Sequence, residues 1–192
     1  MKPLEKSEMT SRRKMQERVK KARGASTRTI VRGTKQLPPS LRLEFSDAFD
    51  PKTAHRIYDM LPLERARLVK AGAPSSLLPK LSVSMGVPTE RLIKVLGLSR
   101  STVARKLAGK EDFSMNDSER IVGLVKLMGQ VEKMVQESGD PKGFDAAKWF
   151  GYWIQQPQAA FARKEPGELM DSSDGREAVS RLLAQMQSGT YA

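Results

Sequence analysis

The sequence of 192 residues contains no cysteine and a single histidine, His55. Without cysteine the chain cannot form disulfides, thiolate nucleophiles or cysteine metal sites. One imidazole excludes multi-histidine metal sites, and its distance in sequence from any nucleophile pattern disfavours Ser-His-Asp catalysis. The phosphate-binding pattern GxxxxGKS/T and the metalloprotease pattern HExxH are also missing. We therefore expect a protein that is not an enzyme, with no catalytic residue, no metal and no cofactor.

Long apolar runs are absent as well. No stretch approaches the roughly 20 apolar residues that cross a bilayer, and the basic N-terminus lacks the apolar segment of a secretory signal. These absences predict a soluble, cytoplasmic protein that has no membrane partner.

Positive charge, by contrast, is abundant and unevenly distributed. Lysine and arginine total 34 against 22 acidic residues, a net charge of +12, which is typical of a protein with a polyanionic partner such as nucleic acid. Residues 1–36 carry 12 basic and 3 acidic side chains, and residues 37–110 carry 13 and 6, whereas residues 111–192 carry 9 and 13. The two ends of the chain therefore indicate different partners.

The apolar residues follow helical periodicity over most of the chain. Residues 1–36 are too polar and charged to order themselves and predict a flexible basic arm, and residues 40–72 are predicted to be helical, with Asp50 as an N-cap before Pro51. Further predicted helices contain Leu77, Leu78, Leu81 and Met85 before Gly86; Glu90 to Leu96; Val103 and Leu107 before Gly109; Ile121, Leu124, Val125, Met128, Val131 and Val135 after a Ser114 cap; and a stretch beginning at Asp145. One turn is expected over Pro166 to Met170, then a last helix capped by Asp174, with Val179, Leu182, Leu183 and Met186 inward and Gly189 just past its end. Apolar and polar residues nowhere alternate long enough for a strand, so we predict an all-α fold.

Two of these helices have the pattern of a helix-turn-helix. Gly97 separates them, Ser99 can cap the second helix, and its first half carries the small polar and basic residues that a helix in the major groove presents to DNA. The predicted DNA-binding residues of the second helix are Ser99, Arg100, Ser101, Thr102, Arg105 and Lys106, and the predicted phosphate contacts are Arg91, Lys94 and Lys110. Ile93 stands where such motifs usually carry a small residue, so we expect a slightly different crossing of the helices. The alternative is an ordinary helical hairpin whose basic face is merely solvated.

The acidic C-terminal block needs a role other than DNA binding. Trp149 and Trp153 are four residues apart, and we favour a core stripe packed on Met128 and Val131 over exposed binding residues. Tyr191, behind the helix-ending glycine, is either a frayed terminus or a mobile plug for a pocket of a partner.

Several segments follow one another in a characteristic order and spacing: Val95 to Lys106 (VLGLSRSTVARK), the helix start Ser114 to Glu119, the Trp149/Trp153 helix, Phe161, Pro166 to Asp171 (PGELMD), and the last helix with Gly189, Thr190 and Tyr191. In these segments the chain, from about Gly72 to Ala192, resembles the Xre/MbcA/ParS antitoxins of RES-type toxin–antitoxin systems. Phe161 to Lys164 replaces the glycine-rich step expected before Pro166, and the basic arm lies outside the resemblance.

This resemblance implies an antitoxin that dimerises, represses its own operon by binding operator DNA, and neutralises a RES-domain toxin that degrades NAD, in a higher hetero-oligomer. With the arm predicted from composition at residues 1–36, the chain is expected to divide further into a DNA-binding domain at 37–112 and a toxin-binding domain at 113–192. An acidic domain suits a toxin cleft that accepts a dinucleotide, so we expect Arg181, Gln185, Gly189, Thr190 and Tyr191 to face the toxin and occlude its active site. The alternative is a stand-alone helix-turn-helix transcriptional regulator or nucleoid-associated DNA-binding protein, which needs only residues 1–110.

Overall fold

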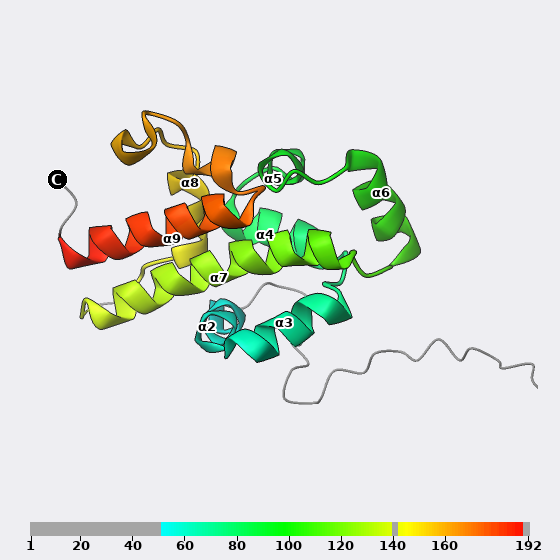
Figure 1. Cartoon of the computed structure of the whole chain (residues 1–192), viewed down its shortest axis with the longest axis horizontal. Coiled ribbons are helices and arrows are strands. Elements are labelled where there is room, and N and C mark those ends of the chain that lie inside the picture. Colours follow the sequence, from blue (N-terminus) through cyan, green and yellow to red (C-terminus); the bar gives the residue numbers. More distant parts are fainter. Residues whose placement is uncertain (1–50, 140–141, 190–192) are drawn as a thin grey trace, which may run out of the picture. The chain divides into compact units, whose positions relative to one another are not determined.

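A computed structural model describes residues 51–139 and 142–189 (Figure 1). Every regular element in these two ranges is a helix, so the predicted all-α fold is confirmed. The helices are α2 (Pro51–Asp59), α3 (Pro62–Ala71), α4 (Leu77–Met85), α5 (Thr89–Val95), α6 (Arg100–Gly109), α7 (Met115–Glu137), α8 (Ala146–Trp153) and α9 (Ser173–Ser188), with 3-10 turns η2 (Ala159–Phe161) and η3 (Pro166–Leu169). The predicted basic arm, the Asp50 cap, Thr190 and Tyr191 lie outside the described residues.

Side-chain caps begin α6, α7, α8 and α9, at Ser99, Ser114, Asp145 and Ser172. Ser114 Oγ accepts a hydrogen bond from the N–H of Asp117 at 3.2 Å, and Asp145 Oδ1 accepts one from the N–H of Lys148 at 3.0 Å. The predicted Asp174 cap of the last helix is wrong. Helix α9 begins at Ser173, two residues earlier than an Asp174 cap implies, and Ser172 Oγ accepts from the N–H of Gly175 at 3.1 Å. Asp174 instead lies in the first turn, where a negative charge is stabilised by the helix dipole.

Helix α7 is the scaffold against which the other helices pack. It contacts α2, α3, α8 and α9, and Figure 1 shows α9 along one side of it and α2 and α3 along the other. The predicted stripe of α7 is buried at Ile121, Leu124, Val125, Met128 and Val131, while Val135 is only partly buried. The hydrophobic core is continuous across residue 112, so the division into residues 37–112 and 113–192 stays a prediction about function.

Helix α9 runs alongside α7 in the same direction. Arg176 forms an ion pair with Glu119 near the start of α7, and Gln187 Nε2 donates to Glu137 Oε2 at 2.8 Å at its end. Because a helix rises about 1.5 Å per residue, the two ends of α7 lie about 35 Å apart. Helix α6 directly precedes α7 in the chain and therefore lies near its N-terminal end, whereas the end of α9 lies near its C-terminal end (Figure 1).

The tryptophan helix contributes to the core. Trp153 is buried and Trp149 is half-buried against the same cluster, with their ring centroids 5.7 Å apart and nearly parallel. The core interpretation is therefore confirmed for Trp153, and Trp149 keeps an exposed edge. Helix α8 lies so close to α4 that a Cβ atom on Gly151 would fall 2.2 Å from the carbonyl oxygen of Met85, so only glycine permits this approach.

Candidate functional site

Two short helices and a tight turn form the predicted helix-turn-helix. Helix α5 buries Leu92, Ile93 and Val95, and α6 buries Val103 against them. Gly97 in the turn has a φ of +59°, a left-handed conformation that side chains with a Cβ adopt only at a steric cost. Ile93 is buried in this contact, so the bulky residue expected between the helices is present.

The outward side of α6 carries the polar and basic residues that the sequence assigned to DNA. Ser99 caps the helix, its Oγ accepting a hydrogen bond from the N–H of Thr102 at 3.5 Å. The candidates that are exposed are Lys94, Ser99, Arg100, Ser101, Arg105 and Lys110. Thr102 is half-buried. The folded chain therefore presents these donors around the start and outer side of one helix, which is the arrangement that groove recognition requires.

Acidic neighbours hold both arginines of α6 in the isolated chain. Arg100 Nε lies 3.1 Å from a carboxylate oxygen of Glu90, and Arg105 Nη1 donates to Glu111 Oε2 at 2.9 Å. Both pairs are exposed, so each stabilises the fold by no more than about 1 kcal/mol. A phosphate or a guanine edge can replace the carboxylate at little cost.

Two other predicted DNA contacts, Arg91 and Lys106, are less exposed and also have partners within the protein. The Arg91 guanidinium forms an ion pair with Glu165, just before η3, and is half-buried. The Lys106 side chain is only 12% exposed, and its Nζ donates to the carbonyl of Asp112 at 2.5 Å. These contacts link α5 to η3 and α6 to the following loop, so the structure gives Arg91 and Lys106 a positioning role.

Arg120 braces the turn of the motif, and the sequence analysis missed it. From α7, Arg120 Nη1 donates to the carbonyls of Gly97 at 2.6 Å and Leu96 at 3.3 Å. Asp171 also packs closely against the turn, since a Cβ on Gly97 would lie 3.0 Å from the Asp171 Cβ. Neither residue is near the motif in sequence, so no local pattern could have found them.

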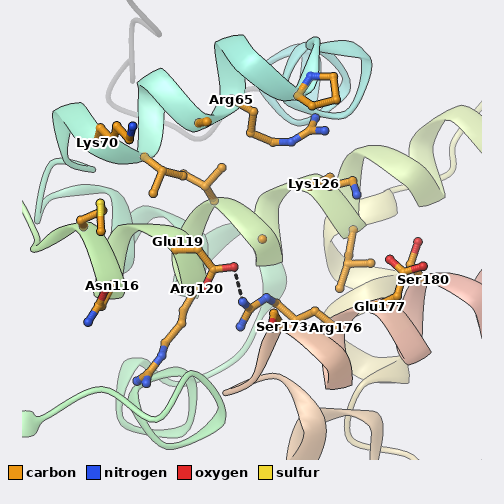
Figure 2. A pocket seen from close by; sticks show the side chains of 17 residues that line it. Arg65, Lys70, Asn116, Glu119, Arg120, Lys126, Ser173, Arg176, Glu177 and Ser180 are labelled. Carbon is orange, nitrogen blue, oxygen red and sulfur yellow. Dashed lines mark hydrogen bonds and ion pairs between the residues drawn. The ribbon is translucent and has the colours of Figure 1, made fainter.

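A basic groove lies between α3, α7 and α9 (Figure 2). Its volume is about 550 Å³, and its charged lining residues are Arg65, Lys70, Glu119, Arg120, Lys126, Arg176 and Glu177. The arginines serve the fold: Arg65 Nη1 donates to the carbonyls of Ile57 and Met60, and Arg176 Nη1 donates to the Met170 carbonyl at 2.8 Å. Burial lowers the pKa of Arg65. Because these guanidiniums are already satisfied, the groove is not built as an anion site.

Three of the residues predicted to face the toxin lie within the described part of the chain, on the exposed side of α9 and at its end. Arg181, Gln185 and Gly189 are all exposed and follow one another at four-residue intervals, so they share one face of the helix end. Arg181 Nε lies 3.2 Å from Glu177 Oε1. Gly189 ends the helix with a φ of +69°, as predicted.

Among residues 51–139 and 142–189, no three His, Asp or Glu side chains gather closely enough to bind a metal ion together. No helix within these ranges is both long and apolar enough to cross a membrane.

Comparison with known proteins places these surfaces in a class. Residues 64–126 match the Antitoxin Xre-like helix-turn-helix domain, and residues 143–189 match the Antitoxin Xre/MbcA/ParS C-terminal toxin-binding domain. The chain is also 40% identical over 136 residues to the "Prs ADP-ribosylating antitoxin" of Sphingobium sp. (strain YBL2), covering 71% of this chain and 86% of that relative. A helix-turn-helix joined to a toxin-binding domain defines the antitoxin of a toxin–antitoxin system. The chain belongs to the Xre/MbcA/ParS family of antitoxins, as the resemblance implied.

Proposed function

We propose that the chain binds operator DNA through α5 and α6 and represses its own operon. Arg100, Ser101 and Arg105 reach base edges in the major groove, with Ser99 and Thr102 beside them, and Lys94 and Lys110 bind flanking phosphates. Arg91 and Lys106 act at the edge of this surface, because their charged groups also hold the motif in place. The observation that supports DNA binding is the exposed row of donors on α6 within a matched helix-turn-helix.

We further propose that the toxin is a RES-domain enzyme that consumes NAD. The relative's name contains "ADP-ribosylating", and ADP-ribosylation takes its ADP-ribose from NAD with release of nicotinamide. The chain itself is not an enzyme in this proposal. It acts by binding, and the acidic balance of residues 111–192 complements a cleft that accepts the pyrophosphate of a dinucleotide.

The end of α9 and the residues behind it occlude the toxin's active site. Arg181 and Gln185 contact the rim of the cleft, and Gly189 turns the chain so that Thr190 and Tyr191 enter it. Supporting this arrangement, the C-terminal end of α9 lies about 35 Å along α7 from the N-terminal end, which α6 precedes. Residues 37–112 therefore serve the operator and residues 113–192 the toxin, and both partners are bound together.

A tail deletion separates the two activities. Removing Gln187 to Ala192 is expected to abolish inhibition of the cognate RES-domain toxin, measured as nicotinamide released from NAD, because the plug is lost. Binding to a promoter fragment of its own operon, measured by gel shift at modest ionic strength, is expected to stay unchanged. Undiminished inhibition by the deleted chain contradicts occlusion by the tail.

The full-length chain provides the test of the function as a whole. We expect it to form a stoichiometric complex with the toxin, to prevent nicotinamide release and to rescue growth when the two are co-expressed. We expect it to behave as a homodimer by light scattering and to shift its own promoter in preference to unrelated DNA. A chain that binds the promoter but captures no toxin would be a stand-alone regulator.

A further inference from the structure

An exposed apolar surface joins α4 of the DNA-binding region to the toxin-binding region. Val83, in the last turn of α4, is 81% exposed, and Phe144 and Tyr152, before and on α8, are 40% and 66% exposed. We name these three residues the apolar ledge. Solvated apolar side chains are ordinary when scattered singly, but a contiguous set next to a hollow marks an interaction site.

The ledge borders a hollow that is lined by residues of α4, α7 and α8. Its volume is about 560 Å³, and its lining includes Val83, Phe144 and Lys148, together with Glu132 of α7. Tyr152 lies four residues after Lys148, on the same face of α8. The Phe144 ring packs 6.1 Å from the Trp149 ring, which anchors its position.

The close crossing of α4 and α8 makes this surface rigid. Gly151 permits α8 to touch the backbone at Met85, two residues after Val83. Asp145 caps α8 through the N–H of Lys148 and also pairs with its Nζ at 3.2 Å. A surface whose side chains are held before binding loses less entropy on association.

We propose that the apolar ledge is part of the toxin interface, so that this interface extends beyond the matched toxin-binding segment onto α4. The inference rests on the proposed function. Phe144 and Tyr152 lie within residues 143–189, so the ledge is continuous with the segment that defines the toxin-binding domain. Val83 lies within residues 64–126, the helix-turn-helix match.

The position of the ledge fits the toxin better than DNA. Glu132 places the hollow on the second half of α7, near Glu137, which contacts the end of α9. Helix α6 lies at the N-terminal end of α4, because Ser75 Oγ, just before α4, donates to the carbonyl of Lys106 at 3.1 Å. Val83 lies at the C-terminal end of α4, away from α6. A toxin that receives the α9 tail can therefore also reach Val83 without approaching the DNA face.

The chemistry of the hollow indicates what the toxin presents to it. The lining of the hollow is apolar at Val83 and Phe144 and charged at Glu132, Asp145 and Lys148. A concave surface is filled by a protruding side chain, whereas two copies of the same hollow placed face to face leave both unfilled. The rim carries Glu132 and Asp145 against Lys148. We expect an apolar side chain of the toxin in the hollow, with a basic side chain next to it facing Glu132.

Glutamine substitutions of exposed residues test the ledge. In the full-length chain, Val83→Gln and Tyr152→Gln are each expected to weaken binding of the purified RES-domain toxin by about tenfold, measured by calorimetry, because apolar contacts at an interface centre carry most of the affinity. Leu63→Gln is the matched control, since Leu63 is 64% exposed on α3. Promoter binding, thermal midpoint and mass by light scattering should match the wild type in all three variants.

The outcomes distinguish the inference from the function on which it rests. If the wild type inhibits the toxin and the ledge variants bind it as tightly as Leu63→Gln does, the ledge is not in the interface, and the proposed function stands. A change of mass without a change of toxin affinity overturns the inference in favour of contact between copies of the chain. If the wild type neither binds nor inhibits the toxin, the proposed function itself fails.

Discussion

Single residues around α6 show that the arginines proposed to contact DNA already have carboxylate partners in the isolated chain. Glu90 holds Arg100, and Glu111 holds Arg105 from outside the helix. Sequence reasoning identified both arginines because the helix start and its cap are local features, but it did not identify their carboxylate partners as competitors for DNA. A carboxylate beside a phosphate contact both occupies the cation and repels the phosphate.

Neutralising one such competitor is expected to tighten DNA binding. Glu111→Gln frees Arg105 and removes a negative charge beside the DNA face, so affinity at low salt should rise several-fold, a change of about 1 kcal/mol. Fluorescence anisotropy with promoter DNA measures this effect. Glu177→Gln on α9 is the control, because it makes the same change of net charge and breaks the exposed pair with Arg181. An equal rise in both variants would mean that only the net charge matters.

Arg120 is the residue whose role depends most on tertiary structure. Arg120→Ala removes two hydrogen bonds from a charged donor to the carbonyls of Leu96 and Gly97, so the free energy of unfolding should fall by about 1 to 3 kcal/mol. Amide exchange at Gly97 and Leu98 should accelerate, and promoter affinity should fall because the turn loses its brace. Unchanged exchange at the turn, measured by mass spectrometry, would contradict this role.

At the scale of elements, caps and glycines explain where helices begin and how closely they pack. Ser99 and Ser114 cap their helices as the sequence predicts, because a cap needs only residues within one turn, and Asp145 caps the helix that is predicted to begin there. The cap of α9 is Ser172 and not Asp174. Ser172, Ser173 and Asp174 each offer a side-chain acceptor, and local sequence does not show which of the three caps the helix. The reason for Gly151 lies in its contact with Met85, which no local pattern reveals.

The Asp145 cap is expected to make stability depend on pH in the acid range. Burial pushes the pKa of Asp145 upward, but hydrogen bonds from Lys148 and the attraction of its ammonium outweigh this and hold the pKa below 3.8. A carboxyl whose pKa is lower in the folded state stabilises the fold above the unfolded pKa, and this stabilisation is lost as the pH falls through the folded value.

Asp145→Asn keeps the acceptor and removes the titration. Between pH 5 and about pH 3 the wild type should therefore lose more stability than the variant, measured by urea unfolding. At neutral pH Asp145→Ala should cost about 1 kcal/mol. Parallel curves for the wild type and Asp145→Asn across this range would show that the carboxylate charge does not stabilise the fold.

At the scale of the whole molecule, the two ends of the chain carry opposite charge balances. The basic excess lies in residues 1–110 and the acidic excess in residues 111–192. The structure adds that α6 and the end of α9 lie at opposite ends of one long helix, with a continuous core between them. We expect this separation to let one chain hold operator and toxin together, as a repressing complex requires.

The basic arm is expected to contribute electrostatically to DNA affinity. Each phosphate that a cation neutralises on B-DNA adds about 0.9 to the slope of log affinity against log salt. Removing residues 1–36, which carry 12 basic side chains, should therefore make this slope shallower, measured with promoter DNA between 50 and 200 mM salt. The toxin affinity of the shortened chain is the control and should stay the same. A slope equal to that of the full chain would show that the arm does not touch DNA.

The amino-acid sequence alone determined the all-α fold, the helix-turn-helix, most caps and the charge division, because helical periodicity, capping and charge are properties of neighbouring residues. Only the tertiary structure decided which cations face solvent and which brace the fold. Arg91 and Lys106, which the sequence predicts as DNA contacts, also contact Glu165 and the Asp112 carbonyl in the folded chain. Arg120 contacts the turn only because α7 packs behind it. The apolar ledge also depends on tertiary structure, because Val83 and Phe144 line one hollow only where α8 crosses α4. These contacts join residues far apart in the chain, so they depend on how the whole core closes rather than on any local pattern.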